Sequence, residues 1–248
     1  MVKKHQRPTL TYFFVILCVV VFVLELYFKQ YYGEDFLKSI FYNYGFSFQN
    51  ILDGKIWVFI TSIFIHATPE HLVLNIIALY FFGKVVEREI GRNKFLIAFF
   101  ASAFFADLFV AALSLTGFSS ITIPTVGASA AIFGLMGISM IVKPLEFIFY
   151  PYLIPIPLVL VALIYTLYNI GTFLLVLTGQ VSSDISYISH IGGLISGLLL
   201  GFREEGSKGG FIIILFILFL LLATPFIFII ISFLENFNYI NIISSTFK

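Results

Sequence analysis

Seven runs of apolar residues divide this chain, and they constrain its fold more than any other feature. An α-helix needs about 20 consecutive apolar residues to cross the hydrocarbon core of a bilayer. Only 11% of the 248 residues are charged, whereas soluble domains carry far more charge. The sequence therefore predicts one all-α polytopic membrane domain. Its expected spans are residues 10–28, 69–86, 95–115, 129–142, 152–177, 186–202 and 211–234.

The fourth run, residues 129–142, is short for a span. Its 14 residues would cover only about 21 Å at 1.5 Å per residue. We therefore expect either that this helix begins below the membrane surface or that the preceding loop dips into the membrane. Irregular backbone at that depth is tolerated only where protein or a water-filled cavity surrounds it. The short run is thus a first indication of a site.

The lysines and arginines predict how the chain is oriented. If the N-terminus is cytoplasmic, ten of them fall on inner segments and four on outer segments, in agreement with the positive-inside rule. We expect residues 1–9 to be cytoplasmic and residues 10–202 to form a six-span core. That core includes an outer interfacial segment, 29–67, with Trp57 as an aromatic anchor. Residues 203–248 would add an inner loop, a seventh span and an outer tail, giving a multi-pass protein of the cell membrane.

The remaining composition excludes several classes of function. A net charge of +1 argues against nucleic-acid binding. Cys18, the only cysteine, lies in an apolar run, so neither a disulfide framework nor a cysteine-based zinc site is expected. The spans contain no HExxH segment and no aspartate pair in a GxGD-like context, which disfavours other intramembrane proteases. We expect no metal and no cofactor. The first apolar run is too long for a signal peptide and is expected to remain as a span.

The sixth run combines small residues with an ionisable one in the segment SHIGGLISGLLLG. His190, Gly193, Gly197 and Gly201 fall within about 80° of one another around a helix. Glycines at four-residue spacing allow a neighbouring helix to approach closely. Simple packing explains the glycines, but an ionisable side chain inside a span is a functional candidate.

The fourth run carries a matching small face. Ala130, Gly134 and Gly137 form this small stripe, and Ser129 and Phe133 flank it. If the two small faces pack together, the outer end of one helix brings Ser129 beside His190. We expect Ala130 and Gly193 to lie where the helices are closest.

The second run opens with HATPEHLVLN. Thr68 is suited to be an N-cap and Pro69 to be the first helical residue, which places His71 and Asn75 four apart on one face. A serine, a histidine and side-chain hydrogen-bond donors can serve as nucleophile, general base and oxyanion site. The sequence therefore predicts a Ser–His dyad. Asp107 is a weaker candidate for orienting the histidine, and we expect it to pair elsewhere in the bundle.

These segments resemble the rhomboid intramembrane serine proteases. GASAAIFG is similar to the family's GxSG segment, HLVLN to its HxxxN segment, and SHIGGLISG to its AHxxGxxxG segment. VVEREIG and IWVFITSIFIH are also similar to family segments. The resemblance covers roughly residues 56–202, and three motifs in order on the expected spans make it specific.

The resemblance implies a rhomboid-like six-helix core, here followed by a C-terminal seventh helix. It also implies hydrolysis of peptide bonds in or near transmembrane segments of membrane-protein substrates, without metal or cofactor. Ser129 would be the nucleophile and His190 the general base. His71, Asn75 and the Ser129 N–H would bind the oxyanion, and Phe133 would pack on the histidine ring. The residues expected to support this packing are Gly127, Ala130, Gly193 and Gly197.

Four positions depart from the family pattern, although none is a reacting group. They are Ala130 in place of the second glycine, Val58 in place of arginine, Ser189 in place of alanine, and Glu89 in place of a basic residue.

Two alternatives remain open. The first is a catalytically weak or inactive rhomboid-like protein that binds membrane clients. The second is a small transporter with a proton path through His190, Asp107 and Glu25, although no repeat and no paired broken helices support it.

Overall fold

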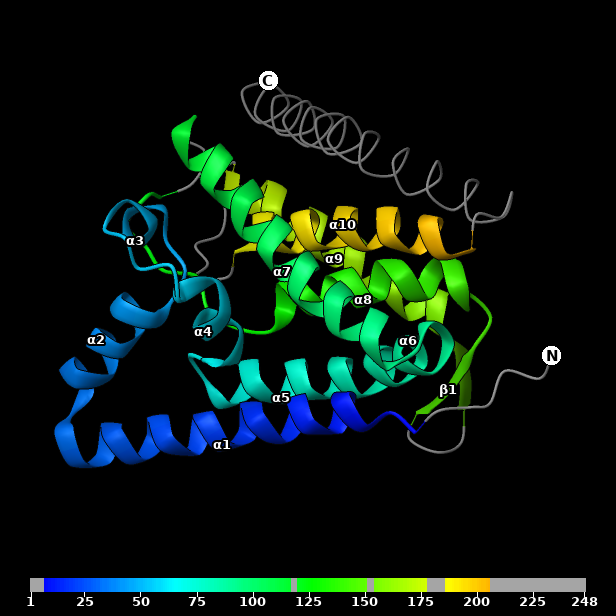
Figure 1. The fold of residues 1–248 in the computed structure, drawn as a ribbon, viewed down its shortest axis with the longest axis horizontal. Coiled ribbons are helices and arrows are strands. Elements are labelled where there is room, and N and C mark those ends of the chain that lie inside the picture. The colour runs from blue at the N-terminus through cyan, green and yellow to red at the C-terminus, as the bar shows by residue number, and fades with distance from the viewer. Residues whose placement is uncertain (1–6, 117–119, 151–153, 178–185, 206–248) are drawn as a thin grey trace, which may run out of the picture.

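The protein forms a bundle of helices around one short central helix, with three small helices at one end (Figure 1). The computed structural model describes residues 7–116, 120–150, 154–177 and 186–205. The helices of the bundle are α1 (Thr9–Tyr32), α5 (Pro69–Ala78), η1 (Leu79–Gly83), α6 (Lys84–Ile90), α7 (Arg92–Leu115), α8 (Ser129–Val142), α9 (Leu158–Leu177) and α10 (Tyr187–Glu205). The smaller elements are α2 (Glu34–Tyr44), α3 (Phe48–Leu52), α4 (Val58–Phe64), β1 (Phe147–Tyr150) and β2 (Ile154–Pro157).

Within the described residues, four helical segments are long and apolar enough to cross a bilayer: α1, the continuous Pro69–Ile90 segment, α7, and α9 through Val176. Their outward faces carry exposed apolar side chains, as expected of surfaces that meet lipid. Examples on α1, α5, α7 and α9 are Ile16, Leu74, Ile97 and Ile164. The expected seventh span, residues 211–234, lies outside the described residues.

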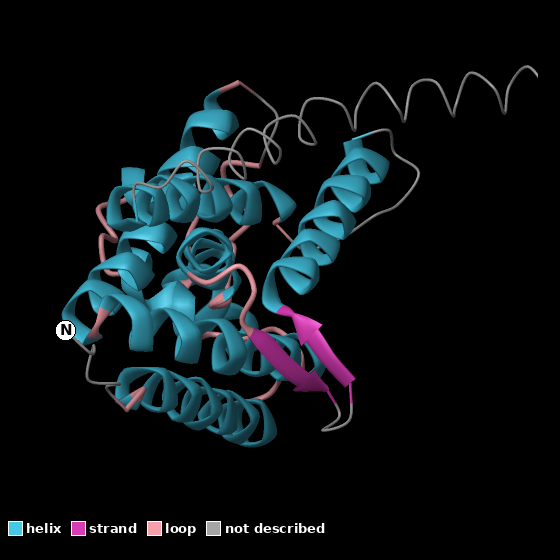
Figure 2. Cartoon of the chain, turned by 90° about the vertical axis from the view of Figure 1, so that its right-hand side faces the viewer, coloured by secondary structure: helices cyan, strands magenta, loops and turns pink. Residues whose placement is uncertain are grey.

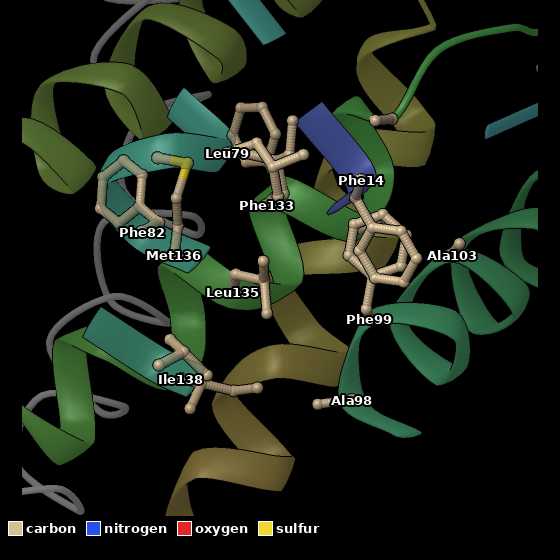
Figure 3. Packing of buried hydrophobic residues seen from close by; sticks show 14 of the residues in the cluster. Phe14, Leu79, Phe82, Ala98, Phe99, Ala103, Phe133, Leu135, Met136 and Ile138 are labelled. Carbon is tan, nitrogen blue, oxygen red and sulfur yellow. The ribbon is translucent and has the colours of Figure 1, made fainter. Parts of the chain in front are cut away.

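The short helix α8 is the centre of the bundle. From Ala130 to Ile141 every one of its residues is buried, and it packs against α10, α7, η1 and α9. Figure 3 shows Phe133, Leu135, Met136 and Ile138 of this helix among aromatic and aliphatic side chains of its neighbours. A helix covered by protein on all sides does not need to match the bilayer thickness, because protein rather than lipid surrounds its ends.

The segment Pro69–Ile90 contains a π-helical turn, η1, where Gly83 meets the start of α1. A Cβ atom on Gly83 would lie 2.9 Å from Thr11 Cγ2, so only glycine allows this approach. One turn later the buried Glu87 carboxylate accepts hydrogen bonds from the backbone N–H of Leu10 (2.9 Å) and Thr11 (2.8 Å). The Thr11 hydroxyl donates to it as well, at 2.8 Å. Glu87 therefore caps the N-terminus of α1 from another helix.

The predicted start of the fifth span, residue 152, is wrong. Helix α9 begins at Leu158, and β1 and β2 form an antiparallel hairpin before it (Figure 2). Pro155 and Pro157 account for the difference, because proline lacks the N–H that a helix interior needs. Apart from this hairpin and an isolated β-bridge between Phe46 and Thr125, the regular secondary structure of the described residues is helical.

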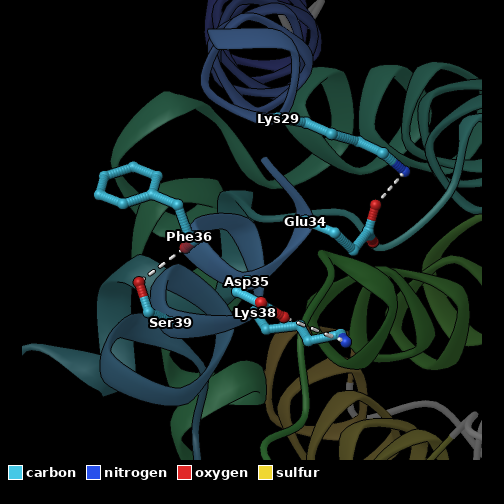
Figure 4. A network of polar contacts seen from close by, with 6 residues as sticks. All are labelled: Lys29, Glu34, Asp35, Phe36, Lys38 and Ser39. Carbon is cyan, nitrogen blue, oxygen red and sulfur yellow. Dashed lines mark hydrogen bonds and ion pairs between the residues drawn. The ribbon is translucent and has the colours of Figure 1, made fainter. Parts of the chain in front are cut away.

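The segment at residues 29–67, expected to be an outer interfacial segment, contains three short helices. An ion pair between Lys29 and Glu34 (2.7 Å) joins α1 to α2. A second ion pair, between Lys38 and Asp35 (3.6 Å), stabilises the start of α2 (Figure 4). Trp57, the expected aromatic anchor, is 46% exposed and donates its indole N–H to the Asn43 carbonyl at 3.0 Å. This segment lies at the end of the bundle where α5, α8 and α10 begin (Figure 1).

Candidate active site

Ser129 is the first residue of α8, and the loop before it is held by backbone hydrogen bonds. Thr125 exchanges two of them with Phe46, at 2.9 and 2.7 Å, and the Gly127 N–H donates to the Ser62 carbonyl at 2.8 Å. Gly127 has a φ of +114°, which side chains other than glycine rarely adopt. The loop therefore presents Ser129 from a fixed backbone, and the first N–H groups of the helix lack intrahelical partners there.

Helix α10 brings His190 to Ser129. The Nε2 atom of the buried imidazole lies 2.7 Å from Ser129 Oγ. Phe133, one turn further along α8, stacks on the imidazole with ring centroids 4.4 Å apart and an interplanar angle of 11°. This places a hydroxyl and an imidazole at hydrogen-bond distance, with one face of the imidazole covered by an aromatic ring.

The small residues of α8 and α10 account for this proximity. A Cβ atom on Gly193 would overlap the Ala130 carbonyl, and one on Gly197 would overlap the Gly134 carbonyl. On the other helix, a Cβ on Gly137 would lie 2.8 Å from the Leu194 carbonyl oxygen. Ala130 and Gly193 thus meet at the point of close approach, and the contact runs through the Ala130 backbone.

His71 and Asn75 lie beside the glycine that precedes the serine. A Cβ on Gly127 would be 2.6 Å from the His71 ring and 3.6 Å from Asn75 Nδ2, so the ring rests on this backbone. Thr68 caps the helix by accepting the His71 N–H at 3.1 Å, with Pro69 in the first turn. Asn75 donates one amide hydrogen to the His71 carbonyl at 3.0 Å, which leaves the other amide hydrogen for a ligand.

The sequence analysis missed one residue of this site, Asn169 of α9. Its Oδ1 lies 2.5 Å from His190 Nδ1, and its Nδ2 donates to the Tyr187 carbonyl at 3.1 Å. Asn169 is 3% exposed. A polar amide in the middle of an apolar run was the available signal, since such residues inside spans are commonly functional or engaged with another helix.

Among the described residues, the hydrogen-bond partners of the His190 ring are Ser129 and Asn169, not Asp107. Its carboxylate is buried in α7, and its Oδ2 has no hydrogen-bond partner among the described residues. Neither the weaker expectation, that it orients the histidine, nor the preferred one, a pairing inside the bundle, is met there.

His66 precedes α5 and has a structural environment. Its backbone N–H donates to the two oxygens of the buried Glu25 carboxylate of α1, at 3.3 and 3.4 Å. Its Nδ1 lies 3.0 Å from the Phe64 carbonyl. Burial, and secondarily the nearby His71, lowers the pKa of His66 to about 4. Within the described ranges, no hydrogen bond joins Glu25, Asp107 and His190, so the proton path of a transporter gains no support.

The four departures from the rhomboid pattern are accommodated in the fold. Val58 is fully buried at the start of α4. The Ser189 hydroxyl donates to the Ser186 carbonyl at 2.7 Å, and Glu89 pairs with Lys143 at 3.7 Å. Ala130 contributes its backbone to the contact with α10. None of the four side chains is a partner in the hydrogen bond between Ser129 Oγ and His190 Nε2.

Comparison with known proteins places these motifs in one family. The profile of the Rhomboid domain matches residues 53–204. Rhomboid protease GluP of Bacillus subtilis is 28% identical over 213 residues, covering 84% of this chain and 38% of the relative. RHOMBOID-like protein 12, mitochondrial, of Arabidopsis thaliana is 29% identical over 185 residues, covering 70% and 52%. Rhomboid protease GlpG of Haemophilus influenzae is 26% identical over 203 residues, covering 81% and 93%.

The chain spans about half or less of the length of the first two of these relatives. The match to the domain covers most of the described bundle, from residue 53 to near the end of α10. It includes Ser129 and the site residues His71, Asn75, Phe133, Asn169 and His190. The protein is a member of the rhomboid family.

Proposed function

We propose that this protein is an intramembrane serine endopeptidase, with Ser129 as nucleophile and His190 as general base. The observation that carries the proposal is the 2.7 Å separation of Ser129 Oγ and His190 Nε2, because a nucleophile and its base must lie within hydrogen-bond reach. The names of its relatives, rhomboid proteases, support the same reaction class. The substrates are transmembrane proteins, since the site lies in a bundle with lipid-facing apolar surfaces.

The reaction uses the dyad twice. His190 Nε2 takes the Ser129 proton as Oγ attacks the peptide carbonyl carbon, and the carbonyl oxygen becomes an oxyanion. The Ser129 N–H, His71 and Asn75 stabilise this oxyanion. His190 then gives the proton to the leaving amine nitrogen as the peptide C–N bond breaks. In the second half, His190 deprotonates a water that attacks the acyl-enzyme, and its proton returns to Ser129 as the carboxylic acid leaves.

The proposal is tested by cleavage of a reporter transmembrane substrate. Ser129→Ala and His190→Ala should each abolish cleavage while the protein still inserts and folds. Because a catalytic unit fails as a whole, the double variant should be no worse than either single variant. Substantial cleavage by purified Ser129→Ala protein would refute the assignment. Absence of cleavage by the folded wild type, together with retained binding of membrane proteins, would favour the client-binding alternative.

We propose further that the site opens to the outer side of the cell membrane and that the N-terminus is cytoplasmic. Support comes from the lysines and arginines. Arg88, Arg92, Lys143 and Arg203 lie at or next to the end of α6, the start of α7, the end of α8 and the end of α10. These helix ends lie at the end of the bundle opposite the start of α8 (Figure 1), as the positive-inside rule requires of a cytoplasmic end. A cysteine introduced at residue 122 should react with an impermeant thiol reagent added to intact cells, and one at residue 143 should not. The reverse pattern would place the site on the inner side.

A further inference from the structure

Three polar side chains and one backbone carbonyl form a single line through the site. Ser129 Oγ lies 2.7 Å from His190 Nε2, and His190 Nδ1 lies 2.5 Å from Asn169 Oδ1. Asn169 Nδ2 lies 3.1 Å from the carbonyl oxygen of Tyr187. The line joins three helices, α8, α10 and α9, and both side chains at its centre are buried.

Only one arrangement of hydrogens satisfies this line. A backbone carbonyl can only accept, so the asparagine atom facing Tyr187 must be the NH₂ group. The Oδ1 atom then faces His190 Nδ1, which must donate. A neutral imidazole with its proton on Nδ1 has an unprotonated Nε2, and that atom accepts from the Ser129 hydroxyl. The opposite amide orientation would set two carbonyl oxygens against each other.

We propose that Asn169 is a positioning residue that holds His190 in the Nδ1–H tautomer and fixes the imidazole plane toward Ser129. This inference rests on the proposed function, and it turns the predicted dyad into a Ser129–His190–Asn169 array. Asn169 acts through the histidine and touches no reacting atom. When His190 takes the serine proton, the amide oxygen continues to accept the Nδ1–H and solvates the imidazolium.

The position also explains why an amide rather than a carboxylate suits this role. An ionised carboxylate buried among spanning helices has a large desolvation cost. An amide accepts the same hydrogen bond with no charge, and its NH₂ group has a second partner in Tyr187. Phe133 covers one face of the imidazole, so the plane and the edge of the ring are constrained independently.

The test compares wild type with Asn169→Leu, Asn169→Asp and the control Thr166→Val. Leucine removes the acceptor at similar volume. Aspartate keeps an acceptor oxygen, and its protonated form can still donate to Tyr187. Thr166 lies one turn earlier on α9, is 2% exposed, and its hydroxyl has no partner among the described residues. Thr166→Val therefore removes a buried polar group from the same helix without touching the array.

Two readouts are required for each folded variant. The first is kcat and KM for a reporter substrate. The second is the ¹⁵N spectrum of histidine-labelled protein, in which the His190 ring is identified by its loss in His190→Ala. The spectrum reports the tautomer whether or not the protein cleaves anything.

We expect a single Nδ1–H tautomer for His190 in wild type and in Asn169→Asp, and a mixed population in Asn169→Leu. The kcat of Asn169→Leu should fall about 10²-fold, the cost of misplacing a catalytic group, with KM near the wild-type value. Asn169→Asp should recover most of kcat, and Thr166→Val should match wild type.

The inference is overturned if Asn169→Leu keeps both the tautomer and kcat, or if wild-type His190 carries its proton on Nε2. It is also overturned if Asn169→Asp is as impaired as Asn169→Leu with the wild-type tautomer intact. Failure of the proposed function looks different, because wild type then shows no Ser129-dependent cleavage while the tautomer result stands on its own. If Asn169→Leu does not fold, the wild-type and Asn169→Asp spectra still decide the question.

Discussion

Helix α8 carries a serine near each end, and the two have opposite environments. The Ser129 hydroxyl lies against an imidazole contributed by another helix. The Ser139 hydroxyl, ten residues later, donates to the Met136 carbonyl of its own helix at 2.8 Å, and the residue is 1% exposed. Both serines belong to the same apolar, closely packed helix. The base brought by α10, rather than the serine or the small-residue packing, therefore distinguishes the candidate nucleophile.

The polar contacts around Ser129 also differ from those at the opposite end of the bundle. Around Ser129 the polar contacts join side chains that are neutral in the tautomer deduced above, and they are buried. At the opposite end, called the charged end below, the polar contacts between helices involve carboxylates. Glu87 caps α1, Lys94 pairs with Glu204, and Lys143 pairs with Glu89. The exposed ion pair between Lys94 and Glu204 can use water and lipid headgroups, whereas His190 and Asn169 are buried, and in a medium of lower dielectric hydrogen bonds and developing charges interact more strongly. We expect substitutions at the site end to affect the reaction and those at the charged end to affect stability.

The largest effect should come from separating α8 and α10 at the site end. Gly193→Leu should abolish cleavage without altering a reacting group, because its side chain must displace the Ala130 backbone and a shift of about 1 Å can cost about 10²-fold in rate. Gly171→Leu is the matched control, since a Cβ there meets nothing within 4 Å. Ala130→Gly should be tolerated. Cleavage is compared at equal folded yield, and normal activity of folded Gly193→Leu would contradict this account of the packing.

A smaller effect is expected from the donors beside Gly127. Removing one oxyanion donor typically lowers kcat by about 10²–10³-fold. His71→Ala and Asn75→Ala should therefore reduce kcat more than they raise KM, with a milder loss if each partly replaces the other. Steady-state kinetics on the reporter substrate separates the two constants. A change in KM alone would make these residues substrate-positioning groups instead.

The smallest effect on catalysis is expected at the charged end. Glu87→Gln weakens three charge-assisted hydrogen bonds at the start of α1 and should lower the free energy of unfolding by about 1–3 kcal/mol, with kcat unchanged. Glu204→Gln, which loses a more exposed pair with Lys94, should cost no more than about 1 kcal/mol. Thermal or denaturant unfolding in detergent measures both. A lowered kcat in stably folded Glu87→Gln would break the proposed division between the two ends.

Much of the bundle could be predicted because its signals are local. Apolar runs indicated α1, α7, α8 and α10 to within a few residues, and Thr68 with Pro69 indicated the start of α5. The small faces around Ala130 and Gly193 predicted which two helices meet. The hairpin before α9 was missed because an apolar run can be strand or helix, and there the prolines decide.

The contact of Asn169 with His190 was not predicted, for a different reason. This contact depends on the rotation of α9 about its own axis, and that rotation is set by packing against α8 and α10. Polar residues such as Thr166 and Asn169 mark one face of the α9 run, but they do not identify the helix or the atom that this face meets. The partner of a histidine nitrogen is a property of the assembled bundle, and the sequence offered only Asp107, as a weaker candidate, for that partner.

The central claim, that the base from α10 makes Ser129 rather than Ser139 reactive, is tested most directly by covalent labelling. A serine-reactive fluorophosphonate probe is added to purified folded wild type, Ser129→Ala and Ser139→Ala, and labelled protein is quantified after electrophoresis. We predict labelling of wild type and Ser139→Ala and none of Ser129→Ala. Equal labelling of Ser129→Ala, or no labelling of the folded wild type, would contradict the account.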